Sequence, residues 1–188
     1  MDTKTALIAA ATEVLDRTGE SGFSTRAVCE IAGVTAPTLY HHFGSADGLL
    51  NAVITEGFTQ FLAHKKSEVL SDDPLVALRQ GWDNYVRFAA ERPQLYAAMA
   101  VRVLQGAHFP AADAARAILM QRVEAVAAQH ALTADVQSAA ELVWVSAHAA
   151  ASLYVLAAQG SPNSAVVEAL RERTLDSLLT SNESETSK

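Results

Sequence analysis

Hydrophobic residues recur at intervals of three and four positions along most of the chain, which places them on one face of an α-helix. The first such run, from Leu7 to Leu15, is followed by Gly19 and predicts a helix over residues 3–18. Strict alternation of apolar and polar residues, the pattern of a half-buried strand, is not found over any useful length. The pattern therefore predicts an all-α protein.

Two short predicted helices follow the first one. Ser24 is a good N-cap for a helix that Gly33 ends. After a tight turn, Thr35 can cap the next helix, in which Pro37 occupies the first turn, where its missing N–H costs little. Two short helices joined in this way form a helix-turn-helix over residues 24–43, whose second helix enters the major groove of DNA.

Proline, glycine and capping residues divide the rest of the chain into further helices. Ser45 opens a long fourth helix with Leu49 and Leu50 on its apolar side. Pro93 closes the fifth helix and opens the sixth, and Gly160-Ser161-Pro162 predicts the start of the last one. The expected helices after the fourth run over residues 74–92, 93–104, 111–129, 134–159 and 162–179, before a polar tail.

The composition indicates a globular protein of the cytoplasm. Half of the residues are hydrophobic and 19% are charged, which is too apolar for a disordered chain. The lone Cys29 cannot form a disulfide within the chain, and the first residues lack the apolar core of a signal peptide. The uncharged segment 142–158 has the length of a membrane span, but it is rich in alanine and contains His148. We therefore expect a buried helix there and no membrane association.

The second helix of the helix-turn-helix offers a surface suited to DNA. Leu39 and Phe43 are four residues apart and point inward. The small side chains among the remaining residues allow close approach to base edges, and the tyrosine and histidine side chains can donate hydrogen bonds to phosphate oxygens. These outward residues are Ala36, Pro37, Thr38, Tyr40, His41 and His42.

The run FSTRAVCEIAGV over residues 23–34, followed by Thr38-Leu39-Tyr40-His41-His42-Phe43, resembles the DNA-binding domain of the TetR (tetracycline-repressor) family of transcriptional regulators. The resemblance implies a helix-turn-helix domain over residues 1–46, a helical domain that binds an effector and dimerises over residues 47–180, and a tail over residues 181–188. It also implies a homodimer that binds a double-stranded DNA operator and is released by a small-molecule effector. Repressor activity is expected from the family alone.

One position departs from the family pattern. Ala46 follows Ser45 where relatives commonly have a lysine that meets a phosphate. Residues 1–50 carry three lysines and arginines against six aspartates and glutamates, a net charge of −3, so DNA affinity is expected to be modest or unusually sensitive to salt. The residues expected to contact DNA are Arg26, Thr35, Ala36, Pro37, Thr38, Tyr40, His41 and His42.

The larger domain combines aromatic and polar groups with many alanines, as an effector pocket requires. Residues 88–96 and the pair Trp144 and His148 resemble a C-terminal subclass with a Trp-His-Gly signature, although Ala149 stands where glycine is expected. Core packing or a subunit interface is the alternative role for these residues. The expected ligand-binding residues are Trp82, Tyr85, Phe88, Met99 and His148.

Two other classes of protein are alternatives to a DNA-binding regulator. An enzyme would need a nucleophile with its base, a metal cluster or a phosphate loop, and the sequence contains no motif of these kinds. His41 and His42 diverge by about 100 degrees on a helix and lack a third ligand, so we expect no metal and no cofactor. The charge of −3 keeps open a protein of the same fold that acts through protein partners with weak or no DNA binding.

Overall fold

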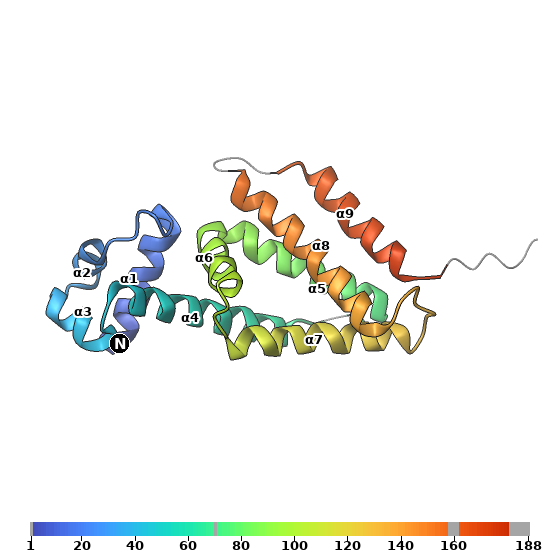
Figure 1. Ribbon diagram of the computed structural model, residues 1–188, viewed down its shortest axis with the longest axis horizontal. Coiled ribbons are helices and arrows are strands. Elements are labelled where there is room, and N and C mark those ends of the chain that lie inside the picture. The colour runs from blue at the N-terminus through green and yellow to red at the C-terminus, as the bar shows by residue number, and fades with distance from the viewer. Residues whose placement is uncertain (1, 70, 158–161, 181–188) are drawn as a thin grey trace, which may run out of the picture. The chain divides into compact units, whose positions relative to one another are not determined.

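The computed structural model describes residues 2–69, 71–157 and 162–180, and it confirms the all-α prediction (Figure 1). Within these ranges there is no β-strand, and an isolated bridge pairs Leu132 with Leu179. The helices are α1 (Thr3–Thr18), α2 (Thr25–Ala32), α3 (Ala36–Phe43), α4 (Ala46–Ser67), α5 (Pro74–Glu91), α6 (Pro93–Leu104), α7 (Pro110–Ala127), α8 (Val136–Leu156) and α9 (Ser164–Leu178).

These helices form two compact units. The first unit contains residues 1–66 and 88–113, and the second contains residues 67–87 and 114–188. Helix α6 therefore belongs to the same unit as the helix-turn-helix, although it follows α5 in the sequence. The domain boundary expected after residue 46 separates a DNA-binding part from a part that binds an effector and dimerises, and it remains a prediction.

The core of the first unit joins the helix-turn-helix to α1, α4 and α6. Leu7, Val28, Leu39 and Leu49 are fully buried and belong to one hydrophobic cluster. Helix α6 adds Leu95 to this cluster, and Leu95 lies against α4 where Gly57 leaves room: a Cβ at position 57 would be 3.0 Å from a Leu95 methyl. The three-helix motif is thus supported by a helix that lies far from it in the sequence.

The ends of the short helices follow from local chemistry. Ser24 accepts a hydrogen bond from the backbone N–H of Ala27, and Gly33 ends α2 with a φ of +66°, in the left-handed region that glycine adopts without strain. Thr35 occupies the N-cap position of α3 as expected, but its side chain does not cap the helix. The hydroxyl of Thr35 lies instead 3.0 Å from that of Thr38.

The core of the second unit is built from α5, α7, α8 and α9. Leu78, Val123, Val143 and Leu175 are almost completely buried in one cluster. Figure 1 shows α8 and α9 side by side, and the small buried side chains of α8 favour close packing. The buried residues of α8 are Ala139, Ala140, Val143, Ser146, Ala147, Ala150 and Ala151.

Helix α8 covers most of the segment that resembles a membrane span. It is long and apolar enough to cross a membrane by length and composition alone. Its buried residues follow the helical repeat along one face, and this face belongs to the core of the second unit. One face of α8 is therefore buried in the folded unit, as the alanine-rich composition predicts, whereas Leu142 and Val145 on the other face are exposed.

The last helix begins later than expected. Asn163 is the N-cap, and its side-chain oxygen accepts a hydrogen bond from the backbone N–H of Ala165 at 3.0 Å. Because asparagine is among the strongest N-cap residues, α9 begins at Ser164 and not at Pro162. The predicted cap Ser161 and the predicted end of the preceding helix at residue 159 lie outside the described residues.

Candidate nucleic-acid interface and ligand site

Helix α3 lies on the surface of the helix-turn-helix, with one face packed on the core and the other face exposed. Leu39 is fully buried and Phe43 is half-buried, as their spacing predicts. The residues expected to face DNA are exposed, apart from the half-buried Thr38, and the side chain of Tyr40 is 45% accessible. The exposed residues are Ala36, Pro37, Tyr40, His41 and His42.

Thr35 and Thr38 form a polar pair at the start of α3. Their hydroxyl oxygens are 3.0 Å apart, so one of the two donates to the other. Since each hydroxyl has a single hydrogen, only one of the two remains a donor while this bond is kept. The pair fixes the side chains at the end of the helix that approaches base edges in helix-turn-helix proteins.

The two histidines of α3 lie side by side on the surface. Their ring centroids are 5.5 Å apart, and the planes are inclined by 69°. Within the described ranges, no group of three or more histidine, cysteine, aspartate or glutamate side chains is placed to hold a metal ion. The geometry of His41 and His42 therefore suits separate contacts to a polyanion better than shared ligation.

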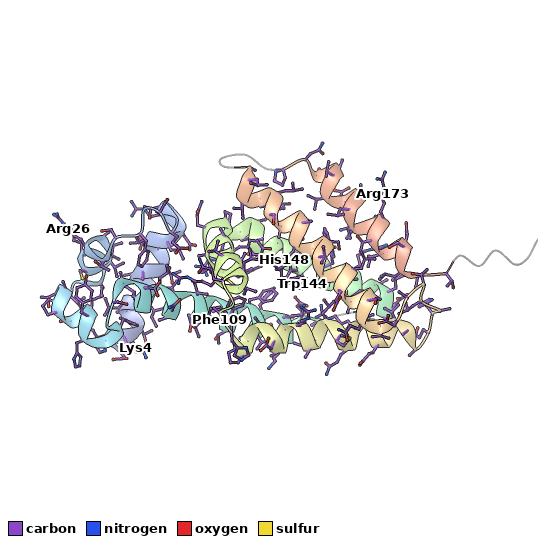
Figure 2. The ribbon with its side chains drawn as sticks, viewed as in Figure 1. Lys4, Arg26, Phe109, Trp144, His148 and Arg173 are labelled. Atoms are coloured by element: carbon purple, nitrogen blue, oxygen red, sulfur yellow. The ribbon has the colours of Figure 1, made fainter. Side chains whose placement is uncertain are left out.

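Arg26 projects from α2 near the helix-turn-helix surface (Figure 2). Its Nε donates to Glu30 Oε1 at 3.1 Å, but the Arg26 side chain is 90% exposed. An ion pair this exposed contributes little free energy, so Arg26 can exchange Glu30 for a phosphate at small cost.

The start of α4 lies directly after α3. Ser45 Oγ accepts the backbone N–H of Gly48 at 2.9 Å, so Ser45 caps the helix as predicted. Ala46, the residue in place of the family's lysine, is exposed at the first position of the helix. A Cβ at position 48 would lie 2.1 Å from the carbonyl oxygen of Phe43, so the tight α3–α4 turn requires glycine there. The sequence pattern does not indicate this role of Gly48, because only the folded backbone brings position 48 close to Phe43.

Three of the five expected ligand-binding residues lie in the second unit. The hydroxyl of Tyr85 is 2.6 Å from Nδ1 of His148, and burial holds the pKa of His148 below its ordinary value. Trp82 is 3% exposed, and its indole N–H donates to Ser146 Oγ at 3.0 Å. Trp82 is therefore a satisfied core residue, whereas Tyr85 and His148 are half-buried.

Two further residues join this cluster. The ring of Trp144 lies 4.4 Å from that of His148, one helical turn further along α8 (Figure 2). The Arg116 guanidinium lies 5.1 Å from the centre of the Trp144 ring, within the range of a cation–π contact. The four-residue spacing in the sequence could have indicated the Trp144–His148 contact. Nothing in the sequence pairs Arg116 with Trp144, because Arg116 lies on a different helix.

The other two expected ligand-binding residues lie in the first unit. Phe88 packs against Phe61, with ring centroids 5.0 Å apart. Met99 is 4% exposed in the core cluster that includes Leu95. The structure thus brings Tyr85, Trp82 and His148 into one unit and assigns Phe88 and Met99 to another.

Comparison with known proteins matches both parts of the chain to one family. Residues 7–53 match the family described as "Bacterial regulatory proteins, tetR family", and residues 78–178 match the "Tetracyclin repressor-like, C-terminal domain". The HTH-type transcriptional regulator UidR of Escherichia coli strain K12 is 31% identical over 67 residues. That stretch is 36% of this chain and only 34% of UidR, about a third of its length.

Solved structures share the fold over nearly the whole chain. A protein of unknown function from Rhodococcus sp. RHA1 is 23% identical, with a TM-score of 0.79 over 96% of this chain and 97% of that one. The transcriptional regulator FadR from Bacillus subtilis, solved with stearoyl-CoA, is 15% identical, with a TM-score of 0.67 over 93% and 98%. The second family match alone covers more than half of this sequence. The chain belongs to the tetR family of bacterial regulatory proteins.

Proposed function

We propose that this protein is a homodimeric transcriptional repressor of the cytoplasm, and not an enzyme, that binds a pseudo-palindromic DNA operator and is released by a small molecule. The observation that carries this proposal is α3: buried Leu39 anchors a short helix whose outward residues are small or able to donate to phosphates. Family membership supports the regulatory role.

The contacts to DNA divide into two kinds. Ala36, Pro37 and Thr38 stand at the start of α3, where small side chains let the helix approach base edges, and the Thr38 methyl group can contact a thymine methyl. Phosphate contacts would come from side chains that carry donors and are exposed, with Thr35 as a further donor at the N-cap. These side chains are Arg26, Tyr40, His41 and His42.

The proposed dimer forms through α8 and α9. The face of α8 opposite its buried residues carries Leu142, Val145 and Leu156, whose exposed fractions are 46%, 54% and 77%. Val166 on α9 is 51% exposed. Large apolar side chains that gather on neighbouring helices mark interaction surfaces, and an isologous dimer buries the same patch on both subunits.

The proposed effector site lies in the second unit around Tyr85 and His148. Their hydrogen bond and the adjacent Trp144 provide polar and aromatic groups that a ligand could engage. The same Trp144–His148 contact supports assignment to the Trp-His-Gly subclass, in spite of Ala149. Trp82 remains a proposed contact of this site, and Phe88 and Met99 remain separate proposals within the first unit; a ligand would have to displace each of these side chains from a packed core.

The effector would act by shifting a population. A ligand can release DNA only if it binds the DNA-incompetent arrangement more tightly than the competent one. By linkage, DNA must then weaken ligand binding by the same factor. A ligand of the second unit whose affinity is identical with and without saturating operator would contradict this mechanism.

Two variants of α3 test the assignment of its contacts. Thr38→Ala should change the preferred base within each half-site, because Thr38 is placed with the base-contacting residues. Tyr40→Phe, which removes only a hydroxyl, should weaken binding to all sequences alike. Selection of preferred duplexes from a random pool, repeated with each variant, measures both effects. Altered specificity in Tyr40→Phe would show that the contacts were assigned wrongly.

A second candidate function rests on the charge of −3 over the first 50 residues. A protein of this fold with weak DNA affinity could instead act through protein partners. A salt titration separates the two: for a DNA-binding protein the logarithm of the affinity falls linearly with the logarithm of the salt concentration, with a slope set by its phosphate contacts. Absence of sequence-preferring binding even at low salt would favour the partner-binding alternative.

A further inference from the structure

Arg102, in the last turn of α6, lies between two carboxylates of the first unit. Its Nη2 is 2.6 Å from Asp47 Oδ1 and 3.3 Å from Glu20 Oε1. The Arg102 side chain is 16% exposed, against 62% for Asp47 and 42% for Glu20. The arginine is thus largely buried against two acidic groups that reach toward solvent.

This contact falls at the start of α4, next to the position where relatives carry a lysine. Asp47 is the second residue of α4 and the acidic residue of its first turn. The N–H groups and dipole of a helix N-terminus attract anions, but a carboxylate in the same turn competes with a phosphate for them. With Ala46 beside it, Asp47 would leave this helix end negatively charged if nothing compensated it.

We propose that Arg102 is a determinant of operator affinity located outside the helix-turn-helix, because it neutralises Asp47 and Glu20 and supplies the positive charge that Ala46 does not. This inference rests on the DNA binding proposed above. Arg102 acts as a positioning residue: it keeps the Asp47 carboxylate in an ion pair and reduces the local charge from −2 to −1. It lies beyond residue 53, where the match to the DNA-binding family model ends.

A second arginine of the same region gives a matched control. Arg92 is the N-cap residue of α6, and its Nη2 bonds Asp16 Oδ2 of α1 at 2.8 Å, while Nη1 lies 3.4 Å from Gln60. Arg92 and Arg102 both tie α6 to acidic groups of other elements in the first unit, and both side chains are largely buried. Only Arg102 is bonded to the first turn of α4. Loss of either should weaken the packing of α6, whereas only loss of Arg102 should specifically weaken DNA binding.

The hydrogen bonds also suggest a variant that keeps the charge. Asp47 Oδ2 accepts from Asn51 Nδ2 at 3.2 Å, so the carboxylate is held from both sides. Arg102 reaches both acidic groups through Nη2, and its buried Nε has no hydrogen-bond partner among the residues that the structure describes. Arg102→Lys should therefore retain most of the effect, because a single positive group at the end of the side chain satisfies the same partners.

The experiment measures operator affinity of the full chain by fluorescence anisotropy, with the best duplex selected from a random pool. We expect Arg102→Gln to weaken binding about five- to tenfold per dimer, a modest factor because these carboxylates are partly exposed. Arg92→Gln should change affinity less than about twofold, with a similar loss of thermal stability. Asp47→Asn should tighten binding in the natural background and restore near-natural affinity in Arg102→Gln.

Three results would overturn the inference. Equal weakening by Arg102→Gln and Arg92→Gln would show that Arg102 only supports α6. Failure of Asp47→Asn to rescue folded Arg102→Gln would show that the exposed carboxylate is not the cause. If Arg102→Gln does not fold, unchanged affinity in Asp47→Asn alone overturns it. Absence of any preferred duplex for the natural chain would instead contradict the proposed function.

Discussion

Ala46→Lys tests whether the first residue of α4 approaches DNA. Ala46 is exposed, so a lysine fits there without displacing a core residue. Adjacent helical residues do not face each other, so the new lysine should remain available to a phosphate despite Asp47 beside it. A partly exposed, screened contact of this kind should contribute about 1 kcal/mol per subunit at low salt. Folding stability should hardly change, because lysine is nearly as good a helix former as alanine.

The salt dependence of DNA binding provides a second quantity that tests the contact at position 46. One added phosphate contact should steepen the slope of log affinity against log salt by about 0.9 per subunit, or about 1.8 per dimer. Anisotropy titrations between about 50 and 200 mM salt measure both affinity and slope. Ala125→Lys adds the same charge at an exposed position of α7, in the other unit, and should have a smaller effect on both.

Three outcomes would contradict a phosphate contact at Ala46. Unchanged affinity and slope in Ala46→Lys, shown to be folded and dimeric, would mean that this helix end does not meet DNA. Equal gains in Ala46→Lys and Ala125→Lys would mean that net charge alone attracts the duplex. A gain that varied strongly among operator variants would also contradict it, because phosphate contacts carry no base preference.

Three further predictions concern the second unit. Gly81→Ala should lower the free energy of unfolding by about 1–3 kcal/mol, because a Cβ there would lie 1.8 Å from Arg122 Nη1 and the guanidinium, which also pairs with Glu68 at 2.8 Å, would have to shift. An unchanged midpoint in denaturant unfolding would contradict this. Burial lowers the pKa of His148, so the imidazole binds a proton more readily in the unfolded chain than in the folded one. The free energy of unfolding should therefore fall as the pH drops through about 6.5. His148→Gln should flatten that pH dependence, and an unaltered slope between about pH 5.5 and 7.5 would exclude His148 as its source. Leu142→Glu should shift sedimentation equilibrium toward monomer, since Leu142 is 46% exposed on α8; an intact dimer would place the interface elsewhere.

The helix boundaries could be predicted where local chemistry decides them. Pro93 and the apolar residues that follow predict α6 over residues 93–104, and the structure has the same bounds. Ser24, Gly33 and Ser45 mark helix ends through their own hydrogen bonds or backbone angles, so no distant residue is needed. The start of a helix is harder to predict where several residues that can cap it are adjacent in the sequence. For this reason α9 begins after Asn163 and not at the predicted residue Pro162.

The candidate DNA-binding and ligand-binding residues could be predicted only where helical periodicity determines which side chains face outward. The outward residues of α3 follow from its spacing, and the exposure of Tyr40 agrees with that expectation. The Arg102–Asp47 pair joins residues 55 positions apart on helices that only the fold brings together. The expected ligand residues illustrate the same limit: composition identifies aromatic side chains such as Phe88, but it does not show that Phe88 packs on Phe61.

In the proposed complex, two chains bind one DNA site through α3. The most direct measurement is a footprint of the purified protein on its preferred duplex, combined with the stoichiometry of the complex. A dimer should protect a pseudo-palindromic site with two half-sites on the same face of the DNA, about one helical turn or roughly 34–40 Å apart. A single asymmetric half-site protected by a monomer, or no preferred duplex at any salt concentration, would contradict it.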